Sequence, residues 1–153
     1  DTKESSYTID ANVEIPDGGA EGVLLSIGGR FGGLSLYVQD KHLVFDYNYV
    51  GLSHNTITSE EEIPTGNATL GFSFDKTSEP DFKNHTAATG IGKLFINGEE
   101  VGSGTIAPTV PLRYGYEEGL EIGTDGQTPV TESYKSPFEF TGTLEKVVLE
   151  VKD

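Results

Sequence analysis

The stretch GGRFGGLSLYVQDKHLVFDYNY, residues 28–49, decides the fold of this 153-residue chain. It begins with two glycine pairs. Two apolar runs follow, at residues 34–38 and 43–49, and the dipeptide Asp40-Lys41 joins them. A two-residue turn at this dipeptide would fold the two runs into an antiparallel hairpin.

The register of this hairpin can be checked against the pattern of apolar residues. On one face the turn aligns apolar residues with each other: Val38 with Leu43, Leu36 with Phe45, and Leu34 with Tyr47. On the other face the pairs are mixed: Tyr37 with Val44, Ser35 with Asp46, and Gly33 with Asn48. A hairpin packed on a core has this division of faces. Lys41 is unusual, because a type I′ turn favours Gly or Asn at its second position, so a longer loop or a bulge remains open.

Other segments of the chain also alternate with period two. Strands are predicted at residues 7–15, 23–27, 56–59, 69–74, 120–122, 138–140 and 144–151, and two extended runs lie within residues 93–101. Asn97-Gly98 is a strong signal for a hairpin turn. Irregular segments are predicted at residues 75–90, 107–119 and 123–137. No segment has helical periodicity, so we predict an all-β, two-sheet antiparallel sandwich whose first and last strands are neighbours.

Two long blocks of sequence resemble a known family. The first contains GGRFGGLSLYV, LVFDYNYVGL and SEEEIPTG, and the second is TVPLRYGYEEGLEIGTDGQTPVTESYKSPFEFTGTLEKV, residues 109–147. Together they resemble the C-terminal β-sandwich domain of bacterial arylsulfatase-type sulfatases. The family's pattern falls here on Gly123, Asp125, Pro129-Val130, Tyr134, Pro137-Phe138 and Gly142.

This resemblance implies a concanavalin A-like or laminin-G-like jelly roll. It also implies a single domain over residues 7–153, taken from the C-terminal end of a larger sulfatase, with residues 1–6 as the end of a linker. The catalytic part of such an enzyme carries a Cys/Ser-x-Pro-x-Arg motif. The chain contains no such motif and no cysteine, so we expect no sulfatase activity from it alone.

The charge of the chain restricts its partners. The formal net charge is −15, from 25 acidic and 10 basic residues. Such a field repels nucleic acid and anionic membrane surfaces, and we expect neither as a partner. Without cysteine, disulfides and thiolate metal sites are excluded. The compartment is not determined by this composition, although a periplasmic or secreted location is favoured over a cytoplasmic one.

The sequence offers little for catalysis or for metal binding. Adjacent carboxylates at 60–62 and 117–118 point in different directions, whereas acid–base catalysis needs a facing pair. Calcium needs several oxygen ligands gathered on a loop, and Asp125 in the run GTDGQT is the best candidate for a structural calcium ion. The alternative is that Asp125-Gly126 simply forms a turn. No other cofactor is expected.

Aromatic residues supply two sets of binding candidates. Sugars stack on exposed rings, and the carbohydrate-binding candidates are Tyr37, Tyr49, Tyr114 and Tyr116. A protein interface is predicted where aromatic residues lie on Gly- or Pro-rich connections: Arg30, Phe31, Tyr134, Pro137 and Phe138. Glycine pairs on both sides of Arg30 and Phe31 predict a tight excursion that presents both side chains. The alternative is that Phe31 and Phe138 fold back onto their own sheets.

Three functions remain open. The first is a non-catalytic accessory domain that packs on the catalytic sulfatase domain and shapes its substrate cleft. The second is an independent, lectin-like carbohydrate-binding module. The third is a jelly-roll enzyme that acts on glycans.

Overall fold

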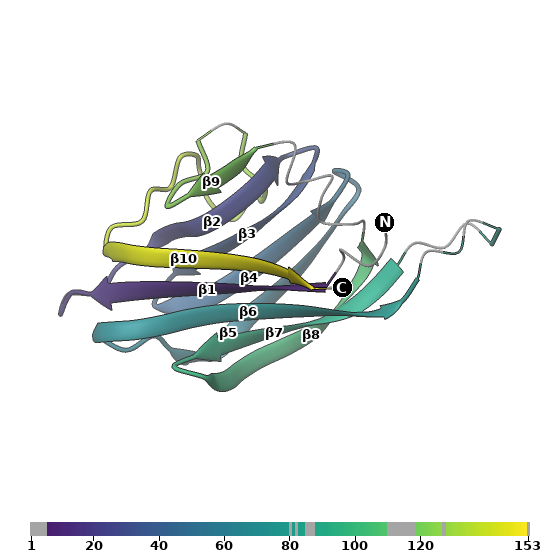
Figure 1. Cartoon of the computed structure of the whole chain (residues 1–153). Helices are drawn as coiled ribbons and strands as arrows, with labels where there is room; N and C mark the ends of the chain where they lie inside the picture. Colours follow the sequence, from purple (N-terminus) through teal and green to yellow (C-terminus); the bar gives the residue numbers. More distant parts are fainter. Residues whose placement is uncertain are drawn as a thin grey trace.

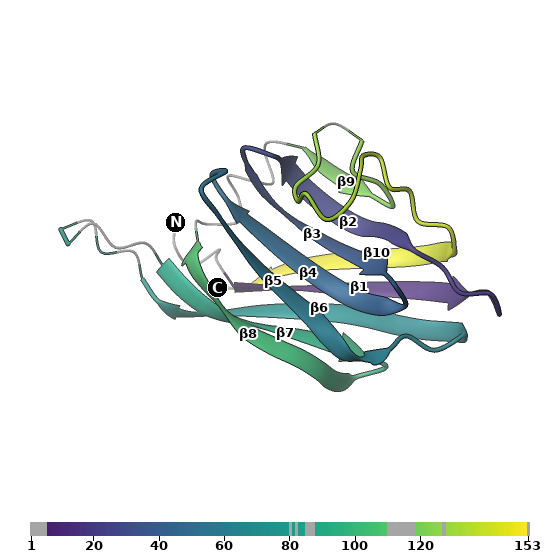
Figure 2. The same ribbon diagram turned by 180° about the vertical axis from the view of Figure 1, so that it is seen from behind.

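The computed structural model describes residues 6–79, 81, 83–84, 88–109, 119–126 and 128–152. Ten β-strands and no helix occur in these residues. The strands form two antiparallel sheets packed face to face, which confirms the predicted two-sheet β-sandwich (Figures 1 and 2). In the described ranges no helix exists that is long and apolar enough to span a membrane.

Each sheet has five strands. The first sheet, in front in Figure 1, has the order β10 (Thr143–Lys152), β1 (Ser6–Ile15), β6 (Gly66–Ser78), β7 (Ala88–Ile96) and β8 (Glu99–Thr109). The second sheet, in front in Figure 2, has the order β5 (Ser53–Glu62), β4 (His42–Tyr49), β3 (Gly32–Gln39), β2 (Gly22–Gly29) and β9 (Leu120–Ile122). The first and last strands, β1 and β10, are neighbours as predicted.

The central hairpin is the β3–β4 pair, and its register is the predicted one. Leu36 lies opposite Phe45, and Val38 lies opposite Leu43. The turn has two residues, and both have positive φ: 50° at Asp40 and 66° at Lys41. Lys41 therefore adopts the left-handed conformation that a type I′ turn requires, and neither a longer loop nor a bulge is needed.

Two predicted loops are shorter than expected. Within residues 75–90, β6 continues to Ser78 and β7 begins at Ala88, because backbone pairing continues where the apolar alternation fades. Within residues 107–119, β8 extends to Thr109. At the N-terminus, β1 begins at Ser6, one residue before the predicted strand. Strand pairing in a sheet is decided by backbone hydrogen bonds, which the side-chain pattern reports only where one face is buried.

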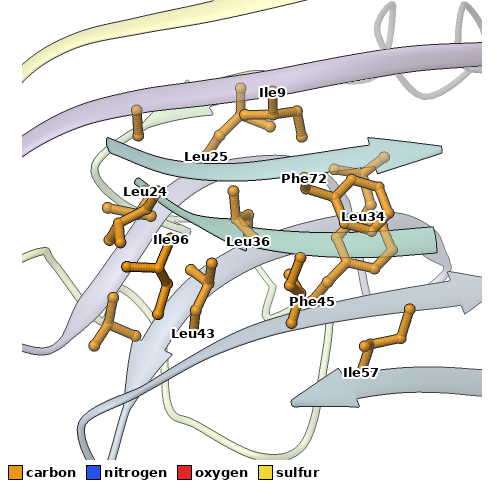
Figure 3. Close-up of a cluster of buried hydrophobic side chains, with 14 of the residues drawn as sticks. Ile9, Leu24, Leu25, Leu34, Leu36, Leu43, Phe45, Ile57, Phe72 and Ile96 are labelled. Atoms are coloured by element: carbon orange, nitrogen blue, oxygen red, sulfur yellow. The ribbon is translucent and has the colours of Figure 1, made fainter. Parts of the chain in front are cut away.

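The hydrophobic core lies between the sheets (Figure 3). Its centre is a stacked pair of rings from opposite sheets: Phe45 on β4 and Phe72 on β6, with centroids 3.6 Å apart and an interplanar angle of 8°. Leu36 and Phe74 are buried beside them, as predicted. The sandwich is therefore held by the apolar faces that the period-two segments predict, and its outer faces are available for other roles.

Candidate functional site

The outer face of the second sheet is covered by the connection between β9 and β10. We call residues 123–126 and 128–140 the covering loop; it is the yellow-green trace in Figure 2. The backbone N–H of Val23 on β2 donates to the Phe138 carbonyl (2.9 Å). The Tyr134 ring meets the Tyr37 ring of β3 edge-on, with centroids 5.0 Å apart, and stacks on Phe138 at 4.9 Å. The loop thus forms a second, smaller core with the outer face of β2, β3 and β4.

Buried hydrogen bonds hold the covering loop in place. Oδ2 of the fully buried Asp125 accepts from the Val130 N–H (2.9 Å) and from the Tyr134 hydroxyl (2.6 Å). That hydroxyl also lies 2.9 Å from Ser35 Oγ on β3. Burial, together with the hydrogen bond to Asp125, raises the pKa of Tyr134 far above its usual value. The phenol therefore stays protonated and fixes the loop on the sheet.

A second buried pair lies under the loop. The Tyr37 hydroxyl donates to Asp46 Oδ2 (2.9 Å), and Thr56 Oγ1 donates to Asp46 Oδ1 (2.8 Å). Burial, and then the charge of the Asp46 carboxylate, raises the pKa of Tyr37 well above its usual value. His54 Nδ1 lies 3.8 Å from the same carboxylate. These bonds pair the buried polar groups on the mixed face of the central hairpin.

These positions correct part of the sequence analysis. Tyr37 and Tyr134 are buried, so neither ring is accessible to a sugar or to a partner. Phe138 is half-buried on its own sheet, and only Pro137 of the loop candidates is exposed. For the covering loop, the alternative in which the aromatic residues fold back onto the sheet is the correct one. The mixed face of the hairpin supplies Tyr37 and Val44 as partners, and this contact is not visible in the local sequence.

Asp125 is a poor fit to a calcium site in this arrangement. Its Oδ2 is used within the loop, and Oδ1 is buried without a hydrogen-bond partner. The described part of the chain places no group of three or more His, Cys, Asp or Glu side chains together. Calcium takes six to eight oxygen ligands, and one free carboxylate oxygen does not supply them. Calcium binding at Asp125 stays a prediction, which melting temperatures with calcium and with chelator would test.

At one end of the second sheet, two hairpin turns form an exposed apolar surface. Residues 30–31 connect β2 to β3, and residues 50–52 connect β4 to β5. Three of their side chains are largely exposed: Phe31 (74%), Val50 (50%) and Leu52 (82%). The Arg30 guanidinium lies over the Phe31 ring, with Cζ 4.9 Å from the centroid. We call Arg30, Phe31, Val50 and Leu52 the hairpin-tip surface.

The glycine pairs next to Arg30 and Phe31 have the role that the sequence predicts. Gly28 lies opposite Gly33 across β2 and β3, with φ of 80° and 155°. A Cβ at Gly28 would overlap the Gly32 carbonyl, and one at Gly33 would overlap the Ile27 carbonyl. Only glycine allows this close approach, which holds the turn tight and presents its side chains outward.

A polar groove lies on the outer face of the first sheet. Its volume is about 400 Å³, and its lining is Asn12, Val13, Asn67, Ala68, Thr69, Asn97 and Glu145. Thr69 donates from its backbone N–H to Asn97 Oδ1 (2.9 Å) and from its hydroxyl to Asn12 Oδ1 (3.1 Å). These bonds fix the two amides through their oxygen atoms. Within the described residues, no hydrogen bond involves their NH₂ groups, so the groove presents oriented donors to a ligand.

An aromatic side chain lies beside this groove. Phe95 on β7 is half-buried, pairs with Gly71 and lies two residues before Asn97. Its neighbours Leu94 and Ile96 face the core, so Phe95 faces outward on the same side as the groove. The sequence analysis did not single out these groove residues. The only signal was the alternation of Asn12 and Thr69 with buried residues, which predicts exposure but not proximity.

Among the carbohydrate candidates from the sequence, Tyr49 is half-buried and packs against the core. Tyr114 and Tyr116 lie outside the described residues, so the structure does not test them. Val50 and Leu52 were not predicted as site residues, although an apolar residue on each side of Gly51 in a turn is an unusual pattern. Only the structure brings their turn against residues 30–31: a Cβ at Gly51 would lie 3.3 Å from the Arg30 carbonyl oxygen.

No family model matches the chain, and no curated protein sequence matches it. Solved structures do match. The CBM40 of Ruminococcus gnavus IT-sialidase, bound to α2,3-sialyllactose, has a TM-score of 0.62 and 17% identity over 95% of this chain and 76% of that chain. Sheep galectin-11 in complex with glycerol has a TM-score of 0.52 and 13% identity, covering 94% of this chain and 88% of that chain.

The fold is a jelly-roll β-sandwich. The laminin-G domains LG4–5 of the mouse laminin α1 chain agree, with a TM-score of 0.67 and 11% identity over 98% of this chain and 37% of that chain. The jelly roll that the sulfatase resemblance implied is thus confirmed at the level of fold. These neighbours do not link the chain to sulfatases, and at such identities they establish the fold alone.

Proposed function

We propose that this jelly roll is a non-catalytic, lectin-like carbohydrate-binding module. The observation that supports the proposal most directly is the polar groove, where amide and hydroxyl groups and one carboxylate lie together on a rigid sheet face. Sugar hydroxyls both donate and accept hydrogen bonds, so they pair with amides and carboxylates. One structural neighbour, the CBM40 of Ruminococcus gnavus IT-sialidase, is bound to α2,3-sialyllactose, and this supports the same use of the fold here.

The groove is suited to binding because its groups are oriented before a ligand arrives. Thr69 holds the Asn12 and Asn97 amides by their oxygen atoms. Asn97 lies in the β7–β8 turn, where φ of 51° followed by 83° at Gly98 keeps the turn tight. Groups that are already ordered lose little conformational entropy on binding. Phe95 beside the groove supplies an apolar surface for the face of a sugar ring.

The two other functions have less support. The role as a sulfatase accessory domain rests on the sequence resemblance, which the structural neighbours do not extend. An enzyme that acts on glycans needs an accessible acid–base pair. Asp46 and its hydrogen-bond partner Tyr37 are both buried, and the raised pKa of Tyr37 keeps its hydroxyl protonated. Neither residue is accessible to a glycan. We therefore favour binding without catalysis.

A glycan array followed by calorimetry tests the proposal. The probes are neutral, sialylated and sulfated oligosaccharides. We expect binding of at least one class, and the double variant Asn12→Ala/Asn67→Ala should weaken it by about tenfold, since each lost hydrogen bond contributes about 0.5–1.5 kcal/mol. Asn55→Ala, an amide on β5 outside the groove, is the matched control and should bind normally. If no glycan binds, or if the double variant binds as tightly as the wild type, the proposal is wrong.

A further inference from the structure

We propose that the hairpin-tip surface is a docking site for another protein, whose contact region is apolar and carries a carboxylate. This inference concerns the opposite sheet from the groove and does not depend on sugar binding. It rests on four observations: the clustering of exposed apolar side chains, a buried asparagine that hydrogen-bonds to both turns, an unfavourable backbone conformation at Val50, and the charge of Arg30.

The apolar exposure is concentrated at this surface. Six large apolar side chains are exposed in the described residues, and three of them are Phe31, Val50 and Leu52. The other three are distributed over β9 and β10, at Ile122, Val148 and Val151. Isolated apolar residues on a surface need no explanation, whereas a cluster marks an interaction site. Phe31 and Leu52 contribute nothing to the core of the domain itself.

A buried asparagine beneath the surface joins the two turns. The Asn48 amide nitrogen lies within hydrogen-bond distance of the Arg30 carbonyl (3.0 Å), the Gly29 carbonyl (3.3 Å) and the Val130 carbonyl of the covering loop (3.0 Å). Its Oδ1 accepts from the Gly51 N–H (2.8 Å). The tips are therefore ordered without a partner. A preorganised apolar surface avoids the entropy cost that a flexible loop would incur on docking.

Val50 has a backbone conformation that does not suit its side chain. Its φ is 43°, in the left-handed region, where a β-branched residue is a genuine outlier and Gly or Asn is favoured. The side chain is half-exposed, so burial does not compensate for this conformation. A residue that is unfavourable for the fold and presents an apolar group to solvent fits a contact with something outside the domain.

The charges identify the class of partner. Arg30 is the only charged residue of the hairpin-tip surface, on a chain with a net charge of −15. A second copy would bring two such charges and two Arg30 side chains together, and an anionic bilayer would be repelled. A carboxylate beside an apolar recess of another protein would pair with the guanidinium and cover Phe31. Four side chains make a small contact, so we expect a transient interface.

Selection from a displayed library of random linear peptides tests this inference with a defined probe. Wild-type protein should enrich peptides that combine large apolar residues with Asp or Glu. The double variant Phe31→Ser/Leu52→Ser should lower their affinity by about tenfold or more, as loss of a central apolar contact does. Val148→Ser, an exposed apolar residue on β10, is the matched control and should leave binding unchanged. Arg30→Gln should remove the preference for acidic peptides.

Several outcomes would overturn it. The proposal fails if no peptide family is enriched, or if the enriched peptides bind the double variant equally well. It also fails if the wild type, but not the double variant, binds phosphatidylcholine vesicles, because the occupant is then a membrane. Concentration-dependent dimerisation that the double variant abolishes would identify a second copy as the occupant. Val50→Gly should fold normally and still weaken peptide binding; unchanged binding would remove Val50 from the site.

Discussion

The covering loop and the hairpin-tip surface have the same sequence signal, but the aromatic side chains of the loop are packed on the sheet and that of the tip is exposed. Both place aromatic residues on connections rich in Gly or Pro. Tyr134 of the loop is 7% exposed, whereas Phe31 of the tip is 74% exposed. The difference lies in what is beneath each segment. The loop lies on Tyr37 and Val44, which form a small core with it, whereas the tips project beyond the end of the sheet and are held by the polar side chain of Asn48.

This comparison shows how a connection can be ordered in two ways. An aromatic side chain can anchor a loop by burial, and it then becomes part of the core. A buried amide can instead anchor the backbone, and the aromatic side chain then stays on the surface. Loops fixed on a rigid scaffold are where binding residues are usually found. The second arrangement leaves an ordered side chain available for a partner.

The largest expected effect comes from removing the anchor of the covering loop. Tyr134→Ala deletes a buried ring and leaves Asp125 without its phenol partner, so the free energy of unfolding should fall by about 3–5 kcal/mol. Chemical denaturation measures this loss. Phe31→Ser should change stability by no more than about 0.5 kcal/mol, as exposed substitutions do. Equal losses for the two variants would remove the distinction between the regions.

Removing the Asn48 side chain, which hydrogen-bonds to both hairpin turns and to the covering loop, should cause an intermediate loss of stability. Asn48→Ala leaves the Arg30 and Val130 carbonyls without their amide donor, so we expect a loss of about 1–3 kcal/mol. Hydrogen exchange should also become faster at the Gly51 amide, because its N–H donates to Asn48 Oδ1 in the wild type. Unchanged exchange there would show that the turn is ordered by its backbone alone.

High pH should affect the covering loop and leave the hairpin tips intact. Tyr37 and Tyr134 have a pKa raised above the usual value of about 10. Since the folded state resists ionisation more than the unfolded state, stability is fully present below about pH 10 and is lost as pH rises above it. Denaturation curves at about pH 8 and pH 11 measure this loss. The buried Tyr7 also has a raised pKa and adds to this loss. Tyr134→Phe removes one of the three groups, so its stability should decline less steeply; an identical decline would contradict the assignment.

A small effect is expected at Val50, and its sign is opposite to that of the losses above. Val50→Gly relieves the left-handed conformation, which costs a non-glycine residue about 1–2 kcal/mol, but increases the freedom of the unfolded chain. The net result should be a gain of up to about 1 kcal/mol in the free energy of unfolding. Thermal melting of Val50→Gly and of the control Val148→Gly gives the comparison. A loss at position 50 would mean that the Val side chain stabilises the tip.

Much of the fold can be predicted from the sequence because most strands pack one apolar face against the core between the sheets. Alternation at residues 7–15 and 69–74 identifies strands, and the pairs across Asp40-Lys41 define a register that a shift of one residue would invert. The tight excursion at Arg30 and Phe31 follows from the glycine pairs. The end of β6 could not be predicted, because its pairing continues through the polar residues 75–78. The start of β7 was missed because its buried positions are small residues, Ala88 and Gly90, which give a weak apolar signal.

The sequence by itself thus determined the all-β class, the central hairpin and the tight turn at Arg30 and Phe31, since these depend on period, turn chemistry and the missing Cβ of glycine. Only the tertiary structure decided that Tyr37 and Tyr134 are buried together, that the turn at residues 50–52 packs against the Arg30–Phe31 turn, and that Asn12, Thr69 and Asn97 form one groove. Each of these groups joins residues from different strands or loops. Their proximity depends on how the strands are ordered in the sheets and on where the covering loop crosses, and no local pattern of residues encodes that order.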